Sequence, residues 1–143
     1  MSGSNPWTTF GRNYNESVKV FEDKTKDTFV AYLNKSIVGF IIIDMQGSFT
    51  GYIKSLAVSP DYRSKGIGSK LIKFAEQYIF KRAPNVFICA SSFNRRAQKL
   101  YYRLGYKKVG KIKDYIIKGH SEILLRKSIS TLSDFKENER KYN

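Results

Sequence analysis

The chain has 143 residues, of which 26 are Lys or Arg and 12 are Asp or Glu, so its net charge at pH 7 is +14. A single cysteine excludes an intrachain disulfide framework, and no apolar run reaches the length of about eighteen residues that a membrane-spanning helix needs, so we expect a cytoplasmic protein without membrane partners. The excess of cations favours polyanionic partners, including nucleic acid, although a solvated basic surface accounts for the charge equally well.

The first segment of the chain predicts little regular structure. Residues 1–6 are small and polar, and no element is assigned to them. From Asn13 to Asp23, apolar side chains recur at helical spacing. This pattern predicts a short helix, with Trp7 and Phe10 packed ahead of it.

Three strand-like runs follow, separated by turn residues. They are Thr28–Leu33, Ile37–Asp44 and Phe49–Val58, and polar turns at 34–36 and 45–48 lie between them. Short connections between successive strands favour antiparallel pairing. We therefore predict a three-stranded antiparallel meander.

A basic loop containing two glycines comes after the third strand, with the sequence Arg63-Ser64-Lys65-Gly66-Ile67-Gly68. A helical pattern follows and ends near Arg82, because Pro84 blocks its continuation. Free N–H groups at the start of a helix bind anions when glycines let a ligand approach the backbone, so residues 64–69 form a candidate phosphate site. Two simple turn glycines would explain the pattern equally well. Neither the dinucleotide fingerprint nor the P-loop motif is present.

The next strand and helix repeat the alternation of elements. Val86–Ala90 is short and fully apolar, as in a strand inside a sheet, and the helix before it predicts a parallel pairing with the third strand. Asn94 can cap a helix that runs from Arg95 to Leu104 and stops at Gly105.

Two more strands complete the predicted domain. They are Tyr106–Lys113 and His120–Lys127, joined by a polar turn. From residue 128 to residue 143 the chain is a polar tail that is either disordered or a short docked helix. We therefore expect a single domain over residues 1–127.

Two segments carry a resemblance to a known family. The first is Leu56-Ala57-Val58-Ser59-Pro60-Asp61-Tyr62-Arg63-Ser64-Lys65-Gly66-Ile67-Gly68, and the second is Asn94-x-x-Ala97-x-x-Leu100-Tyr101-x-x-Leu104-Gly105-Tyr106. Together, in this order and at this spacing, they closely resemble the motifs of the GNAT acetyltransferase superfamily over residues 28–127. The peptide and protein N-acetyltransferase branch is resembled more weakly.

The resemblance implies an α+β fold of three layers. Its sheet is mixed and mostly antiparallel, with helices on both faces and one central parallel strand pair that splays into a V. Too few residues precede Trp7 to form the strand with which the family normally starts. We therefore expect that first family strand to be missing.

The resemblance also implies an acetyl-CoA-dependent N-acetyltransferase that moves an acetyl group to a primary amine by direct transfer in a ternary complex. No metal is expected, and the protein would be a monomer or a homodimer. Residues at the family's cofactor-binding positions are Leu56, Ala57, Val58, Arg63, Ser64, Lys65, Gly66, Ile67, Gly68, Ser69, Asn94, Ala97 and Tyr101.

The catalytic candidates are one residue within the second motif and several outside both motifs. Tyr101 matches the family's tyrosine that protonates the departing thiolate, although a tyrosine on this helix could also simply pack in the core. Candidates for the base are Tyr52, His120 and Glu122, whereas Cys89 in its apolar strand is more typical of a core residue. Ordered water could also take the proton.

The sequence alone does not identify the acceptor amine, and it leaves two alternative functions. A turn at Asp114-Tyr115 is similar to the loop that covers the peptide in N-terminal acetyltransferases, and it favours a peptide or protein amine over a small-molecule amine or polyamine. A basic nucleic-acid-binding module, in which exposed tyrosines stack on bases, would explain the charge but not the two motifs. A sensor that binds acyl-CoA without transferring the acyl group is the third possibility.

Overall fold

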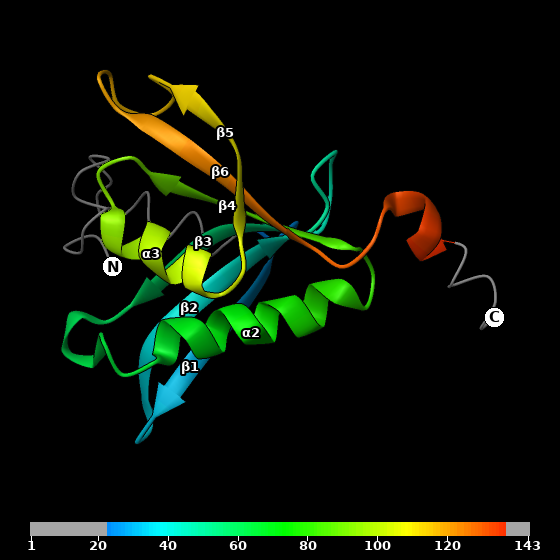
Figure 1. Cartoon of the computed structure of the whole chain (residues 1–143). Helices are drawn as coiled ribbons and strands as arrows, with labels where there is room; N and C mark the ends of the chain where they lie inside the picture. Colours follow the sequence, from blue (N-terminus) through cyan, green and yellow to red (C-terminus); the bar gives the residue numbers. More distant parts are fainter. Residues whose placement is uncertain (1–22, 137–143) are drawn as a thin grey trace.

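The computed structural model describes residues 23–136, in which three consecutive strands form an antiparallel meander (Figure 1). They are β1 (Asp27–Leu33), β2 (Ser36–Asp44) and β3 (Tyr52–Val58). Asn34 and Lys35 both adopt a positive φ between β1 and β2, which is the backbone geometry of a two-residue hairpin turn. The predicted meander is therefore confirmed.

The sheet opens between β3 and β4 (Asn85–Ser91), the pair that helix α2 (Ile67–Phe80) connects. These strands run parallel and are paired only at Tyr52 with Phe87 and at Ile53 with Ile88. The pairing of β2 with β3 skips Lys54, so β3 carries a bulge directly after its last contact with β4. The bulge bends β3 away, and the predicted splay of the central parallel pair is confirmed.

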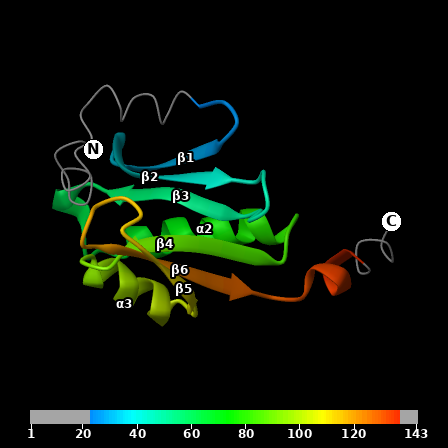
Figure 2. The same cartoon turned by 90° about the horizontal axis from the view of Figure 1, so that it is seen from above.

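Helix α3 (Arg95–Arg103) and strands β5 (Lys107–Lys113) and β6 (Ser121–Ser128) complete this region. The chain returns so that β6 pairs with β4 and β5 lies at the edge, giving the strand order β1-β2-β3-β4-β6-β5. Figure 2 shows α3 and β5 at one side of the sheet and β1 at the other. The architecture is a mixed α+β fold with a single parallel strand pair.

The main core lies on one face of the sheet, where α2 and α3 pack. Ile41, Ile43 and Ile53 contribute to it from the strands, and Ile72 and Tyr101 contribute from the helices. A smaller buried cluster, Phe40 and Ile42 with Ala57, lies on the opposite face because side chains alternate along a strand. The helix predicted for Asn13–Asp23 and the missing first strand concern residues outside the described range.

The third strand starts later than the predicted Phe49. Gly51 has a φ of 93°, and a Cβ there would lie 2.4 Å from the backbone oxygen of Asn85. The turn before Tyr52 therefore needs glycine, and β3 begins only after it. The remaining strand and helix boundaries differ from the predictions by two residues or fewer.

The tail after β6 contains a short helical segment at residues 132–136, in which Leu132 is exposed. Between residues 23 and 136, no helix has the length and apolar character needed to cross a membrane. The single domain ending at residue 127 and the cytoplasmic location stay predictions.

Candidate functional site

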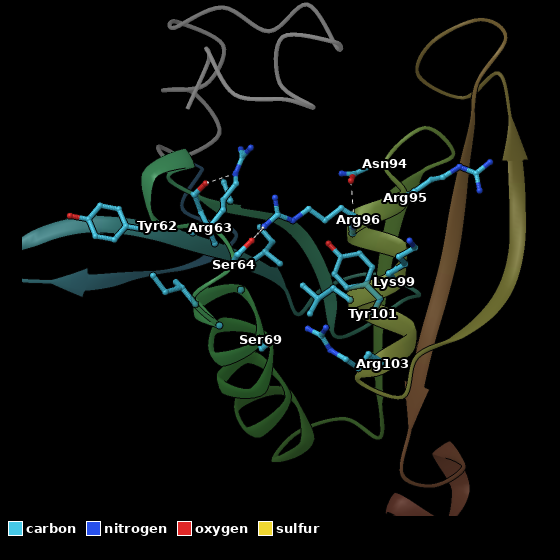
Figure 3. Close-up of a pocket in the computed structure, with 18 of the residues that line it drawn as sticks. Tyr62, Arg63, Ser64, Ser69, Asn94, Arg95, Arg96, Lys99, Tyr101 and Arg103 are labelled. Carbon is cyan, nitrogen blue, oxygen red and sulfur yellow. Dashed lines mark hydrogen bonds between the residues drawn. The ribbon is translucent and has the colours of Figure 1, made fainter.

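A cavity of about 950 Å³ lies between the C-terminal end of β3, the start of α2 and the length of α3 (Figure 3). Every residue that the sequence predicts to bind a cofactor lines this cavity, with the exception of Lys65. The two motifs are far apart in the chain, and the fold brings them to opposite walls of one space.

The loop before α2 presents backbone donors to the cavity. Gly66 precedes the helix in the left-handed conformation, with a φ of 80°, and no side chain caps the helix there. The first bond within the helix runs from the N–H of Lys70 to the oxygen of Gly66, at 3.1 Å, so the N–H groups of residues 67–69 have no partner in their own helix. Arg63 holds the loop against β3 by donating from Nε to the Val58 oxygen at 3.3 Å.

Helix α3 supplies most of the charge on the other wall. Arg95, Arg96, Lys99 and Arg103 all line the cavity, and none of its lining residues is acidic. The guanidinium of Arg96 donates to the Ser64 hydroxyl, so it bridges the two walls, as Figure 3 shows. The arrangement favours an anionic ligand with several negative charges.

These α3 cations are not among the binding residues predicted from the sequence, although their spacing indicates that three of them share one side of the helix. Arg95, Lys99 and Arg103 recur every four residues and so form one ridge on the helix. Lys65, in contrast, is turned aside: its Nζ lies 5.3 Å from the centre of the Tyr62 ring. The loop thus contributes backbone groups and Arg63, and α3 contributes the remaining charge.

Tight packing holds the two walls together. A Cβ on Gly68 would lie 3.5 Å from Cδ2 of Leu100 on α3, an ordinary contact distance that leaves no room for a longer side chain. On α3, Asn94 accepts a hydrogen bond from the N–H of Ala97 at 3.2 Å and caps the helix as expected. The cap fixes the first turn of α3 and the cations that it carries.

Tyr101 lies at the inner end of the cavity. Its side chain is only 6% exposed, and Figure 3 shows it directed from α3 into the space between the two helices. Burial raises its pKa above the ordinary tyrosine value, and nearby Cys89 adds to the shift. The phenol therefore stays protonated at neutral pH and can donate a proton to an anion in the cavity.

A second group of polar residues lies on the other face of the sheet. In β4, Ile88 and Ala90 point into the main core, so Cys89 and Ser91 point the opposite way. Tyr52 of β3 hydrogen bonds to Cys89, and Glu122 of β6 is the ladder partner of Ser91. Tyr52, Cys89, Ser91 and Glu122 therefore form one cluster, which we call the carboxylate cluster.

Glu122 is the charged member of the carboxylate cluster and is 7% exposed. Burial raises the pKa of this carboxyl, and a hydrogen bond from Ser91 opposes part of the shift. Burial and the neighbouring Cys89 also raise the pKa of Tyr52, and burial raises that of the Cys89 thiol. Glu122 is thus the group of the cluster that can accept a proton near neutral pH.

The base candidate His120 and the predicted peptide-covering turn at Asp114-Tyr115 do not all join the cluster. Tyr115 lies close enough to Tyr52 to influence its pKa. His120 is exposed, and its ring packs edge-on against Phe93 with centroids 5.0 Å apart. Asp114 closes its own turn by accepting a hydrogen bond from the N–H of Gly119 at 2.7 Å.

The splay of β3 from β4 lies between the two sites. Beyond Ile53 and Ile88 the strands are not paired; residues 56–58 on the β3 side of this gap line the cationic cavity, and Cys89 of the carboxylate cluster lies on its β4 side. Cys89 lies near both sites, because it influences the pKa values of both Tyr52 and Tyr101. A proton donor and a proton acceptor therefore lie on either side of one opening.

Comparisons with known proteins agree with this geometry. Residues 4–106 match the Acetyltransferase (GNAT) family. An uncharacterized N-acetyltransferase of Methanocaldococcus jannaschii is 35% identical over 101 residues, which are 69% of this chain and 64% of that protein. The chain thus spans just under two thirds of that relative's length.

Two further proteins match larger shares of the chain. An N-alpha-acetyltransferase of Saccharolobus solfataricus is 27% identical over 71% of this chain and 68% of its own length. Among solved structures, an aminoglycoside 6'-acetyltransferase type Ii superposes with a TM-score of 0.71 at 23% identity, over 87% of this chain and 82% of that one. The second likeness shows the fold alone.

Proposed function

The chain belongs to the Acetyltransferase (GNAT) family, and we propose that it transfers an acetyl group from acetyl-CoA to a primary amine by direct attack within a ternary complex. One observation carries the proposal: β3 and β4 part between a cationic cavity on one face of the sheet and the buried carboxyl of Glu122 on the other. Direct transfer needs such an opening, because donor and acceptor must approach each other from opposite sides.

The residues present suit the phosphates of acetyl-CoA. The free N–H groups at the start of α2, with Arg63 and Arg96 beside them, offer hydrogen bonds and charge for a pyrophosphate. The remaining α3 cations extend this positive wall, and no lining carboxylate opposes it. Acetyl-CoA supplies an activated thioester, and these groups would fix its position.

The strand edges suit the rest of the cofactor. Beyond the bulge at Lys54, the edge of β3 that faces β4 is free of ladder bonds over residues 55–58. Its backbone groups can therefore pair with the amide groups of the pantetheine arm. In the family the amide at the position of Val58 polarises the acetyl carbonyl, and we assign it the same role here.

Proton transfer is assigned to Tyr101 and Glu122. Glu122 accepts the proton that the attacking amine loses, directly or through water, and its raised pKa brings it closer to neutrality than an ordinary carboxyl. The C–N bond forms as the C–S bond breaks, and Tyr101 donates its proton to the sulfur. Tyr52 orients the acceptor, and His120 lies outside this group because it packs on Phe93.

A peptide or protein amine is the favoured acceptor. The relative from Saccharolobus solfataricus is named an N-alpha-acetyltransferase, and it covers more than two thirds of both chains. The rim near Tyr52 carries Tyr115, whose side chain is 65% exposed and available to contact an extended peptide. Small amines and polyamines form the competing class of acceptors.

Steady-state acetylation with acetyl-CoA and an acceptor panel tests the proposal. The panel should hold short peptides with free α-amines, polyamines and aminoglycosides. We expect transfer to peptides, with initial-rate patterns of a ternary complex and no acetylated enzyme. Binding of acetyl-CoA without transfer to any amine would instead indicate a sensor and would contradict the enzymatic role.

Tyr101→Phe tests the assigned acid within the same assay. Removing only the hydroxyl should lower kcat about 100-fold while the Kd of acetyl-CoA stays unchanged. Tyr32→Phe is the control, because Tyr32 is 67% exposed on β1 and lies outside both sites. Equal rates for Tyr101→Phe and the wild type would show that another group protonates the sulfur.

A further inference from the structure

The side of the molecule where α3 meets β5 carries cations far beyond the cavity. By the register of β5 with β6, Lys108, Lys111 and Lys113 point to the same face of the sheet as α3, since their partners include the core residue Leu125. On α3, Arg95 and Lys99 line the rim of the cavity and are also exposed, and Figure 3 shows Arg95 reaching toward β5. Figures 1 and 2 both show α3 and β5 as neighbours.

Acidic residues do not offset this charge. Neither α3 nor β5 contains an Asp or a Glu. Within residues 23–136 the ion pairs are those of Lys26 and Lys127, so the three β5 lysines have no carboxylate partner there. Like charges held close together repel each other, and a polyanion relieves this repulsion when it binds.

An aromatic side chain lies on the same side. Tyr102 of α3 is 45% exposed, whereas its neighbour Tyr101 is buried. Residues 95, 99 and 102 lie on one side of the helix, so Tyr102 is placed beside Arg95 and Lys99. An exposed ring among unpaired cations is the combination by which proteins hold single-stranded nucleic acid, because phosphates meet the cations and a base stacks on the ring.

We propose that this surface, made of Arg95, Lys99, Tyr102, Lys108, Lys111 and Lys113 and called here the α3–β5 surface, binds single-stranded nucleic acid, for which RNA serves as the probe. The proposal does not rest on the acetyltransferase activity. Nucleic acid fits better than an acidic protein, because the exposed apolar side chains of β5 are few: Ile112 points to the opposite face with its partner Glu122, which leaves Val109 as a small anchor for a protein interface.

Fluorescence anisotropy with a labelled single-stranded RNA oligonucleotide provides the test. The full chain should bind with an affinity that falls steeply as salt rises. The triple variant Lys108→Gln, Lys111→Gln, Lys113→Gln should lower the slope of log K against log salt by about 2, since each lost phosphate contact removes about 0.7, and should weaken binding about tenfold or more. None of these lysines lines the cavity, so acetyl-CoA binding should be unaffected.

The matched control carries Lys24→Gln, Lys73→Gln and Lys81→Gln, which remove the same charge at exposed positions elsewhere. It should keep most of the RNA affinity, and Tyr102→Ala should weaken RNA binding but not the binding of poly-glutamate. Equal losses in the two triple variants would show only general attraction and would overturn the proposal. So would poly-glutamate binding as tight as RNA binding, or complete displacement of RNA by saturating CoA.

Discussion

The two sides of the opening between β3 and β4 are built in different ways. The cationic cavity uses backbone groups and side chains from two short segments, residues 56–69 and 93–103. The carboxylate cluster takes one residue each from β3 and β6 and two from β4. A binding site for a common cofactor can therefore be recognised from contiguous motifs, whereas an acceptor site depends on strand register.

The two sides also differ in electrostatics. The cavity is open and cationic, so it attracts an anion by electrostatic interactions. Dissolved salt weakens these interactions by screening. The carboxylate cluster is buried, so a single carboxyl acts in a weakly screened environment and its pKa rises. We expect substitutions in the cavity to change mainly cofactor affinity and substitutions in the cluster to change mainly turnover.

Glu122→Gln should give the largest effect. It keeps the size of the side chain and the contact with Ser91 but removes the proton acceptor, so kcat/KM for the amine should fall about 100-fold or more. In the wild type the raised pKa of Glu122 should place a rising limb of the rate above the pH range of an ordinary carboxyl. That limb should disappear in the variant, while the Kd of acetyl-CoA stays the same.

Thermal unfolding supplies the control for Glu122→Gln. A carboxyl whose pKa is raised by folding binds its proton more tightly in the folded state, so it costs stability as the pH rises through its folded pKa. Gln carries no such cost, and the variant should melt no lower than the wild type at pH values above that pKa. An unchanged rate and pH profile in a folded variant would remove Glu122 from the mechanism.

Gly68→Leu should give the next largest effect, on the cavity side. The added side chain would extend past Leu100 into the space between α2 and α3 and block access to the helix N–H groups. Loss of hydrogen bonds to a charged group should raise the Kd of acetyl-CoA about tenfold or more. Calorimetry would measure this Kd, and kcat at saturating acetyl-CoA should change little.

Gly110→Leu is the matched control for Gly68→Leu. Gly110 has open space around the position of a Cβ and lies on β5, outside the cavity. The Gly110→Leu variant should keep the wild-type Kd of acetyl-CoA. Gly68→Ala should also bind with nearly the wild-type Kd, because a methyl group fits at 3.5 Å from Leu100. If Gly68→Leu bound acetyl-CoA as tightly as Gly110→Leu does, the phosphates would have to bind elsewhere.

Much of the fold follows from local patterns in the sequence. Apolar alternation and turn residues predict the meander, and the helix between β3 and β4 predicts their parallel pairing. The start of β3 could not be predicted, because the need for glycine at position 51 comes from the backbone of Asn85, which is distant in the sequence. When a contact between distant residues sets the end of a strand, the local sequence does not reveal that end.

The candidate site likewise has one part that local sequence patterns predict and another part that depends on distant contacts. The residues predicted to bind the cofactor all line one cavity except Lys65, whose side chain packs against the Tyr62 ring instead. The register of β4 with β6 brings Glu122 beside Ser91, and no spacing in the sequence reveals that pairing. His120 is only two residues from Glu122 in the sequence. It lies just before β6, however, and its ring packs against Phe93.

A comparison of two neighbouring cations should give the smallest effect and the sharpest test of the cavity wall. Arg96 bridges from α3 to Ser64 across the cavity, whereas Lys65 belongs to the glycine loop but does not line the cavity. Arg96→Gln removes an exposed, charge-assisted contact, and we expect about a fivefold rise in the Kd of acetyl-CoA. Lys65→Gln removes the same charge and should change the Kd of acetyl-CoA by less than about twofold, because screening weakens a charge that does not contact the phosphates.

Calorimetric titrations at low and high salt would measure the Kd of both variants, and the difference between the variants should shrink as salt rises. A larger loss for Lys65→Gln than for Arg96→Gln would show that the loop, and not α3, supplies the charge for the phosphates.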